Sequence, residues 1–156
     1  MNLFVTCAHS LEPVLHKELV SMGYHQAKED FRGVYIPNVT LKDIYKINYE
    51  SRIAIRELLP IKRFNVYNAN SLYKEVKSID WTQWVPSEAT IAIDSHVSHP
   101  AFKNTLYAAQ KTKDAICDQL REARGFRPDV NIKDPDVKLH LFIHNKKGTL
   151  SFDTSL

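Results

Sequence analysis

Seven histidines are the first candidates for metal chemistry in this 156-residue chain. His96 and His99 could bring two imidazoles together, but no cysteine or carboxylate lies at ligand spacing beside them. His140 and His144 would share one face of a strand, where the rise per residue places them about 13 Å apart, too far to bind one ion. We therefore expect no metal site, and no Cys–His nucleophile pair is supported either.

A phosphate cradle for a nucleotide cofactor is equally unsupported, because such loops depend on closely spaced glycines. The chain has four glycines and contains neither a G-x-G-x-x-G motif nor a Walker loop. No other group of side chains forms a catalytic constellation. The residues therefore predict a binding protein with no catalytic residue and no cofactor of its own.

Basic residues gather in the second half of the chain, with aromatic residues between them. Lys103, Tyr107 and Lys111 are four residues apart and would form one ridge on a helix. Lysines neutralise phosphates, exposed rings stack on unpaired bases, and a helix start near Asn104 offers free N–H groups. The plainer alternative is a solvated helix face. The expected RNA-binding residues are Lys103, Asn104, Tyr107, Lys111, Lys113, Arg121, Arg124, Arg127, Lys146 and Lys147.

The helix that carries this ridge is expected over Pro100–Gly125, capped by Asn104 and ended by Gly125. Its inward face is expected to hold Leu106, Ala109, Ile116, Leu120 and Ala123.

Other patterns complete the half that begins at Asn65. A helix capped near Asn68 precedes Trp81 and Trp84, which we expect to fill the core or a domain seam and not to hold a ligand. Alternating patterns predict strands over 90–97 and 137–144, and a turn at 145–148 leads to a returning strand at 149–153. The order of elements is therefore α-β-α-β-β.

The first part of the chain gives a different order. Strands are expected over 3–7, 24–28, 31–37 and 53–64, and helices over 10–22 and from Thr40 onward, with Leu41, Ile44, Tyr45 and Ile47 facing inward. The order β-α-β-β-α-β predicts a ferredoxin-like unit with two helices on one face of a four-stranded antiparallel sheet. Gly33 suggests a bulge or a close backbone approach. The whole chain is expected to be α+β.

Composition sets the remaining limits. The net charge of +3 is mild, and Cys7 and Cys117 are expected to be core thiols of a reducing cytosol. The sequence shows no leader peptide and no apolar run near the roughly 18 residues that a membrane span needs. We therefore expect a cytoplasmic protein with no membrane partner.

Several segments are also similar to a known family. Together they resemble the N-terminal region of the bacterial large-subunit ribosomal RNA guanine-N2 methyltransferases, which are THUMP-containing RNA methyltransferases. The match runs nearly end to end, although His9-Ser10 stands where the family often has Arg-Gly. The matching segments are HSLEPVLHKELVSMGY (9–24), YESRIAIRELLP (49–60), LYKEVKSIDW (72–81), FKNTLYAAQKTKDAICDQL (102–120) and RPDVNIKDPDVKLHLFIHNKKGTLSFDTS (127–155).

The resemblance implies a ferredoxin-like domain over residues 1–64 and a THUMP RNA-binding domain with a mixed sheet over residues 65–156. It implies that ribosomal RNA is the partner, and that S-adenosylmethionine and the chemistry belong to a C-terminal Rossmann-like domain absent from this chain. The chain would then bind RNA without catalysing methyl transfer, while the full-length parent would be a methyltransferase. Two alternatives stay open: a THUMP module of a tRNA-modifying enzyme, and a protein-docking domain that does not bind RNA.

Overall fold

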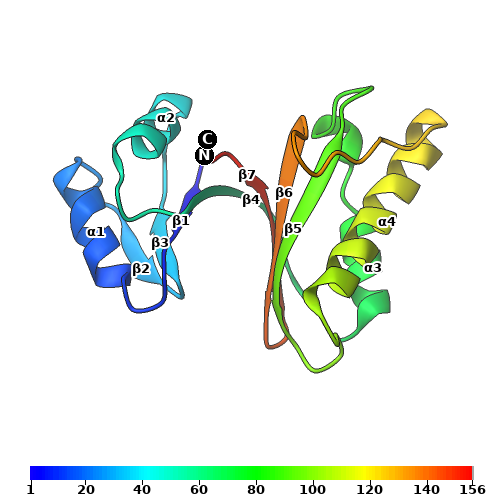
Figure 1. Cartoon of the computed structure of the whole chain (residues 1–156), viewed down its shortest axis with the longest axis horizontal. Coiled ribbons are helices and arrows are strands. Elements are labelled where there is room, and N and C mark those ends of the chain that lie inside the picture. Colours follow the sequence, from blue (N-terminus) through cyan, green and yellow to red (C-terminus); the bar gives the residue numbers. More distant parts are fainter. Residues whose placement is uncertain (156) are drawn as a thin grey trace. The chain divides into compact units, whose positions relative to one another are not determined.

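The computed structural model describes residues 1–155 and divides into two compact units. Unit 1 consists of Met1–Pro60 together with the residues from Phe152 onward, and unit 2 consists of Ile61–Ser151 (Figure 1). The domain boundary expected between residues 64 and 65 falls at the end of the strand that leads from one unit to the other. That boundary stays a prediction. No helix within residues 1–155 is both long and apolar enough to span a membrane.

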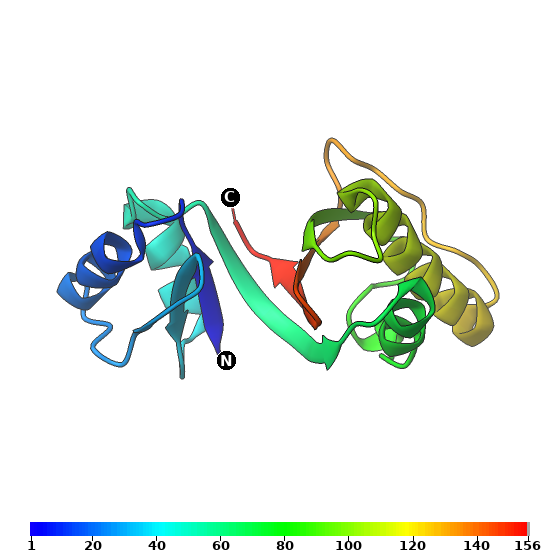
Figure 2. The ribbon, with the colours of Figure 1, turned by 90° about the horizontal axis from the view of Figure 1, so that it is seen from below.

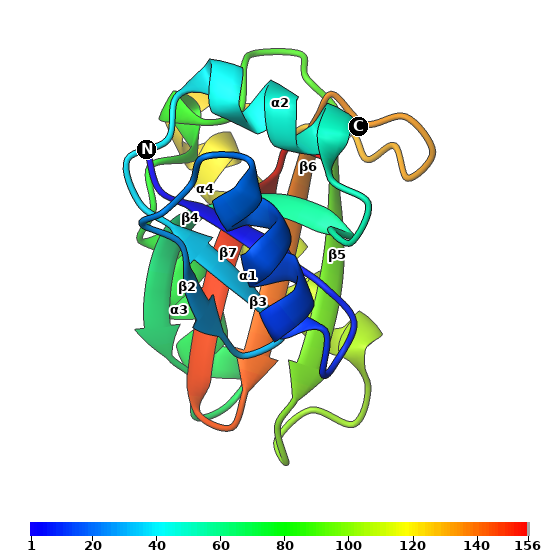
Figure 3. The same ribbon diagram turned by 90° about the vertical axis from the view of Figure 1, so that its left-hand side faces the viewer.

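Unit 1 has the expected β-α-β-β-α-β order. Its strands pair antiparallel in the order β2-β3-β1-β4, and both helices lie on the same face of them (Figures 1 and 3). The predicted ferredoxin-like arrangement is therefore confirmed. The elements are β1 (Leu3–Thr6), α1 (Glu12–Ser21), β2 (Lys28–Asp30), β3 (Gly33–Ile36), α2 (Leu41–Glu50) and β4 (Arg56–Asn65).

Helix α2 begins as predicted but exposes two residues that were expected inside. The Asp43 amide donates to Thr40 Oγ1, and the Thr40 amide donates to Asp43 Oδ2 at 2.8 Å, which forms a capping box. Ile44 and Ile47 are buried. Leu41 and Tyr45, in contrast, are each 58% exposed, so their expected inward position was wrong. A ten-residue helix on a small sheet buries only a narrow stripe of side chains.

Gly33 marks a close approach between neighbouring strands. It lies opposite Thr6 in the pairing of β1 with β3. A Cβ atom at this position would lie 2.4 Å from the Val5 carbonyl oxygen and 2.7 Å from the Phe4 ring. Only glycine therefore fits here, as its place inside the expected strand suggested.

Unit 2 has the expected α-β-α-β-β order and a mixed sheet. The strand order is β4-β7-β6-β5, and β5 pairs parallel with β6 from Ile91 opposite Val137 to Ser98 opposite His144. Helices α3 and α4 lie next to each other on one face of β5 and β6 (Figures 1 and 2). The elements are α3 (Ala69–Lys77), the 3-10 helix η1 (Trp81–Gln83), β5 (Ile91–Ser98), α4 (Thr105–Arg124), β6 (Val137–His144) and β7 (Lys147–Asp153).

The core of unit 2 confirms part of the sequence analysis. Trp81 is fully buried and donates from Nε1 to the Val76 carbonyl at 2.9 Å, whereas Trp84 is 39% exposed. On α4, Leu106 is 65% exposed and Ala123 is also exposed, so their expected inward position was wrong. The buried face of α4 is formed by Ala108, Thr112, Ala115, Ile116, Cys117 and Leu120.

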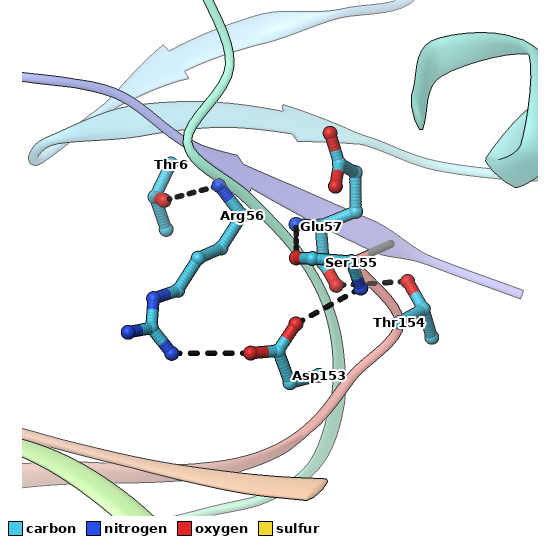
Figure 4. Close-up of polar contacts among 6 residues, drawn as sticks. All are labelled: Thr6, Arg56, Glu57, Asp153, Thr154 and Ser155. Atoms are coloured by element: carbon cyan, nitrogen blue, oxygen red, sulfur yellow. Dashed lines mark hydrogen bonds and ion pairs between the residues drawn. The ribbon is translucent and has the colours of Figure 1, made fainter. Parts of the chain in front are cut away.

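The end of the chain returns to unit 1 and binds the start of β4 (Figure 4). Arg56 pairs with Asp153 at 3.1 Å. Thr154 donates from both its amide and its hydroxyl to the Glu57 carbonyl, each at 2.8 Å, and the Glu57 amide donates to Ser155 Oγ at 3.0 Å. Unit 1 is thus built from both ends of the chain.

These bonds form a clasp around the Glu57 backbone, and Glu57 itself is only 4% exposed. Burial raises the pKa of Glu57 above its ordinary value, and the charge of Asp153 adds to this, while a hydrogen bond from Ser155 acts in the opposite direction. Ionised Glu57 therefore costs folding free energy.

Replacing Glu57 by glutamine should stabilise the chain at neutral pH. The unfolded carboxyl ionises at its ordinary pKa, whereas the folded one keeps its proton to a higher pH. The contribution of Glu57 to stability is therefore complete below the ordinary pKa and is lost as the pH rises through the raised pKa. Urea unfolding of Glu57→Gln should show a gain on the order of 1 kcal/mol at pH 7 and a smaller gain at pH 4. An equal gain at both pH values would contradict this account; the exposed Glu29→Gln is the control.

Candidate nucleic-acid interface

Both helices of unit 2 begin at the same end of the unit, beside the turn between β6 and β7 (Figure 1). Asn68 caps α3 by accepting from the Ser71 amide at 2.9 Å, and Asn104 caps α4 by accepting from the Tyr107 amide at 2.8 Å. Each cap satisfies one of the free N–H groups of its helix, and others remain. Because helix starts carry partial positive charge, this end favours an anion.

Hydrogen bonds connect the three loops at this end. The Asn145 amide donates to the Ser98 carbonyl at 3.0 Å, and the Val66 amide donates to the Lys146 carbonyl at 2.8 Å. His99 Nε2 lies 2.9 Å from the Val66 carbonyl oxygen. The β6–β7 turn, the loop before α3 and the loop before α4 therefore form one surface.

We call this surface the helix-start end and define it as residues 65–68, 98–104 and 145–148. These segments contain Lys103, Lys146 and Lys147 and no aspartate or glutamate. The first turns of α3 and α4 also lack acidic residues. Lys147 Nζ donates to Asn65 Oδ1 at 3.1 Å, while Lys103 and Lys146 are exposed. Uncompensated positive charge is therefore concentrated here.

Aromatic rings lie beside these lysines. Tyr107 is 41% exposed, and its ring packs against Phe102, which in turn contacts His99 with the ring edge. Tyr67, which the sequence analysis did not select, is 59% exposed. Tyr67 could have been selected because it immediately precedes Asn68, the cap of α3. It was not selected because its segment was expected to be only a loop that joins two elements. Two exposed rings thus accompany the cations.

The expected ridge on α4 is only partly present. Lys103 lies in the loop before the helix, while Lys111 and Lys113 are half-buried on α4. The structure therefore brings Lys103, Asn104 and Tyr107 together with Lys146 and Lys147, and it places Lys111 and Lys113 further along the helix.

The three arginines lie at the opposite end of α4 and have partners within the protein. At the rise of an α-helix, Arg121 is about 24 Å from the first residue of α4. Arg121 lies 3.4 Å from Asp118, and Arg127 lies 3.9 Å from Asp114. Arg124 donates from Nη2 to the carbonyls of Thr82 at 3.1 Å and Val85 at 2.6 Å. The assignment of all ten residues to RNA contact stays a prediction. The structure separates them into three groups: those at the start of α4 and in the β6–β7 turn, Lys111 with Lys113 along α4, and the arginines.

Other chemistry has little support in the described part of the chain. No group of three or more histidine, cysteine or acidic side chains within residues 1–155 is placed to hold a metal ion. Burial raises the pKa of the Cys7 thiol above its ordinary value, which disfavours the nucleophilic thiolate. The glycines end helices or fit between strands, and none opens a strand-to-helix phosphate loop. These glycines therefore give no support for the phosphate-binding loop of a nucleotide cofactor in the described part of the chain.

Comparison with known families agrees with both units. The family model described as THUMP domain matches residues 66–153. The chain belongs to the THUMP domain family. A second family model, described as RlmL ferredoxin-like domain, matches residues 2–57. The resemblance drawn from the sequence segments is therefore confirmed, and so is the fold class of a ferredoxin-like unit with a THUMP domain.

Individual relatives are similar over the whole chain. The ribosomal RNA large subunit methyltransferase K/L of Pseudomonas putida strain W619 is 36% identical and that of Pseudomonas aeruginosa strain PAO1 is 37% identical, each over 99% of this chain. The chain spans only 21% of the length of these relatives. The crystal structure of a possible methylase from Clostridium difficile 630 matches 98% of this chain and 41% of that chain, with a TM-score of 0.82 and 25% identity.

Arg124 is expected to serve the fold of this THUMP domain. Arg124→Ala removes the donor to two carbonyl groups and should lower the free energy of unfolding by about 1–3 kcal/mol. Arg121→Ala on the same helix loses only an exposed ion pair and should cost about 0–1 kcal/mol. Urea unfolding of both variants makes the comparison. Equal losses would show that the Arg124 hydrogen bonds contribute little.

Proposed function

We propose that this chain is the RNA-binding part of an S-adenosylmethionine-dependent ribosomal RNA methyltransferase. In this proposal the THUMP domain delivers large-subunit ribosomal RNA to a catalytic domain elsewhere in the full-length protein. S-adenosylmethionine would bind that other domain. A cytoplasmic location accompanies this proposal.

The observation that carries the proposal is the helix-start end of unit 2. Its lysines have no acidic neighbours within the loops that form it, and two helix starts add partial positive charge. Phosphate groups fit such a surface, since backbone amides and lysines are their usual partners. The exposed rings of Tyr67 and Tyr107 can stack on unpaired bases beside those phosphates.

The choice of ribosomal RNA as the bound RNA comes from the names of the relatives. The Pseudomonas proteins are called ribosomal RNA large subunit methyltransferases, and this chain aligns with about a fifth of their length. The same surface would serve a THUMP domain attached to a tRNA-modifying enzyme, so the choice of ribosomal RNA rests on these names. The arginines at the other end of α4 are less suited to RNA because internal partners occupy them.

The proposal predicts that charge reversal at the helix-start end weakens RNA binding. Lys103→Glu combined with Lys146→Glu should lower affinity about 10-fold or more at low salt, and it should reduce the salt dependence because two phosphate contacts are lost. The loss should be similar for RNAs of different sequence, since phosphate contacts do not read bases. Fluorescence anisotropy with a labelled RNA that contains both a hairpin and an unpaired tail measures both quantities.

A matched control changes the net charge by the same amount elsewhere. Lys28 in β2 and Lys133 after α4 are exposed, so Lys28→Glu with Lys133→Glu should have a small effect. Equal losses in the two double variants would show that only overall charge matters. A chain that binds no RNA at low salt would overturn the proposed function and favour a protein-docking role.

A further inference from the structure

Helix α2 of unit 1 displays large non-polar side chains to solvent. Leu41 and Tyr45 are each 58% exposed, and Tyr49 is 88% exposed. Because they are four residues apart, they form one row along the helix, which we call the tyrosine ridge. Solvent-facing helix positions normally carry polar or charged residues, and a non-polar group there indicates an interaction surface.

The tyrosine ridge is not needed for the packing of unit 1. Ile44 and Ile47 supply the buried side of α2, with exposed fractions of 2% and 0%. The capping box between Thr40 and Asp43 fixes the start of the helix. The ridge therefore has no evident structural task within residues 1–155.

A row of cations runs next to the ridge. Lys42 and Lys46 each follow a ridge residue by one position, and both are exposed. Lys46 is held in place because its Nζ donates to the Met22 carbonyl at 3.1 Å and lies 5.8 Å from the centre of the Tyr24 ring. An ammonium group has three donors, so Lys46 can still bind an anion. Arg52, just beyond the helix, is also exposed.

Acidic groups on α2 oppose these cations only weakly. Asp43 is engaged by Thr40 and accepts from the Tyr24 hydroxyl at 3.0 Å. The bond from the Thr40 amide is the main cause that lowers the pKa of Asp43. Glu50 is exposed, follows Tyr49 and continues the row of Lys42 and Lys46, four residues beyond Lys46. The surroundings of the ridge therefore carry more exposed positive than negative groups.

We propose that the tyrosine ridge binds an unpaired stretch of RNA, with bases stacked on Tyr45 and Tyr49 and phosphates beside Lys42 and Lys46. Rows of rings next to cations bind single strands because every base has a flat face and every phosphate a charge. A non-polar protein partner fits less well, since Lys42 and Lys46 lie beside the first two residues of the ridge. This inference rests on the proposed function and adds a second RNA contact in the ferredoxin-like unit.

The test replaces the rings without removing non-polar surface. Tyr45→Leu with Tyr49→Leu keeps a non-polar ridge and a good helix former but abolishes base stacking. Affinity of the whole chain for a fluorescein-labelled, unstructured RNA should fall about 5-fold for each lost stack, or about 30-fold in the double variant. Tyr45→Phe with Tyr49→Phe keeps the rings and should bind within about 2-fold of the parent chain.

A second measurement locates the contact. Ultraviolet cross-linking to the same RNA followed by trypsin should modify the peptides Asp43–Lys46 and Ile47–Arg52, which contain the two tyrosines. The Leu variant should lose both cross-linked peptides while keeping those from the helix-start end.

The outcomes separate this inference from the proposed function. If the Leu variant binds RNA as well as the parent chain while Lys103→Glu with Lys146→Glu binds poorly, the ridge is not an RNA site and the proposed function stands. If the Phe variant loses as much affinity as the Leu variant, base stacking is also excluded. If the parent chain binds no RNA, both proposals fail, and a protein partner for the ridge becomes the better explanation.

Discussion

The parallel pairing of β5 with β6 is the constraint on which the candidate interface depends. Two parallel strands cannot be joined by a tight turn, so the chain must cross over through a helix. Helix α4 provides that crossover, and it therefore starts beyond the end of β5, at the same edge where β6 ends. The loop with Lys103 and the turn with Lys146 are brought together for this reason. In open sheets that contain parallel strands, ligands often bind at such an edge.

The lysines and the arginines of unit 2 lie at opposite ends of α4 and have different partners because of the same arrangement. The arginines near the end of α4 can reach backbone carbonyls and carboxylates, and a guanidinium satisfies several acceptors at once. Arg124 in this way connects α4 to η1 through Thr82 and to the segment just after η1 through Val85. The lysines at the start of α4 and in the β6–β7 turn lie next to helix starts, where carboxylates are absent. One end of unit 2 therefore uses its cations for the fold, while the other leaves most of them exposed.

Much of this structure follows from the sequence because local signals agree with one another. Asn104 and the Thr40–Asp43 pair correctly predicted the starts of α4 and α2. The alternation of non-polar and polar residues correctly predicted β6, and the turn signal after it predicted the returning strand. The sequence could not predict how much of each helix surface the sheet covers. Periodicity shows that Leu41 and Tyr45 share a stripe with Ile44, but not how wide the buried stripe is. Leu106 was misplaced on α4 for the same reason.

Helix α2 departs from its own residue pattern at two positions. A sequence that specifies its fold at every level usually departs from the pattern where another requirement acts. Leu41 and Tyr45 looked like core residues by type, and the structure exposes them together with Tyr49. The partners of the arginines were hidden for a different reason: Arg124 meets carbonyls of residues about forty positions earlier, and such pairings depend on tertiary structure.

The clasp around the Glu57 backbone has a consequence for folding during synthesis. The bonds from Thr154 and Ser155 to Glu57 join residues 97 and 98 positions apart. Glu57 therefore leaves the ribosome nearly a hundred residues before Thr154 and Ser155 do. The start of β4 meanwhile lacks its last partners, and an unpaired strand edge invites wrong pairing. The nascent ferredoxin-like unit therefore stays open to wrong pairing until residues 154 and 155 have been made.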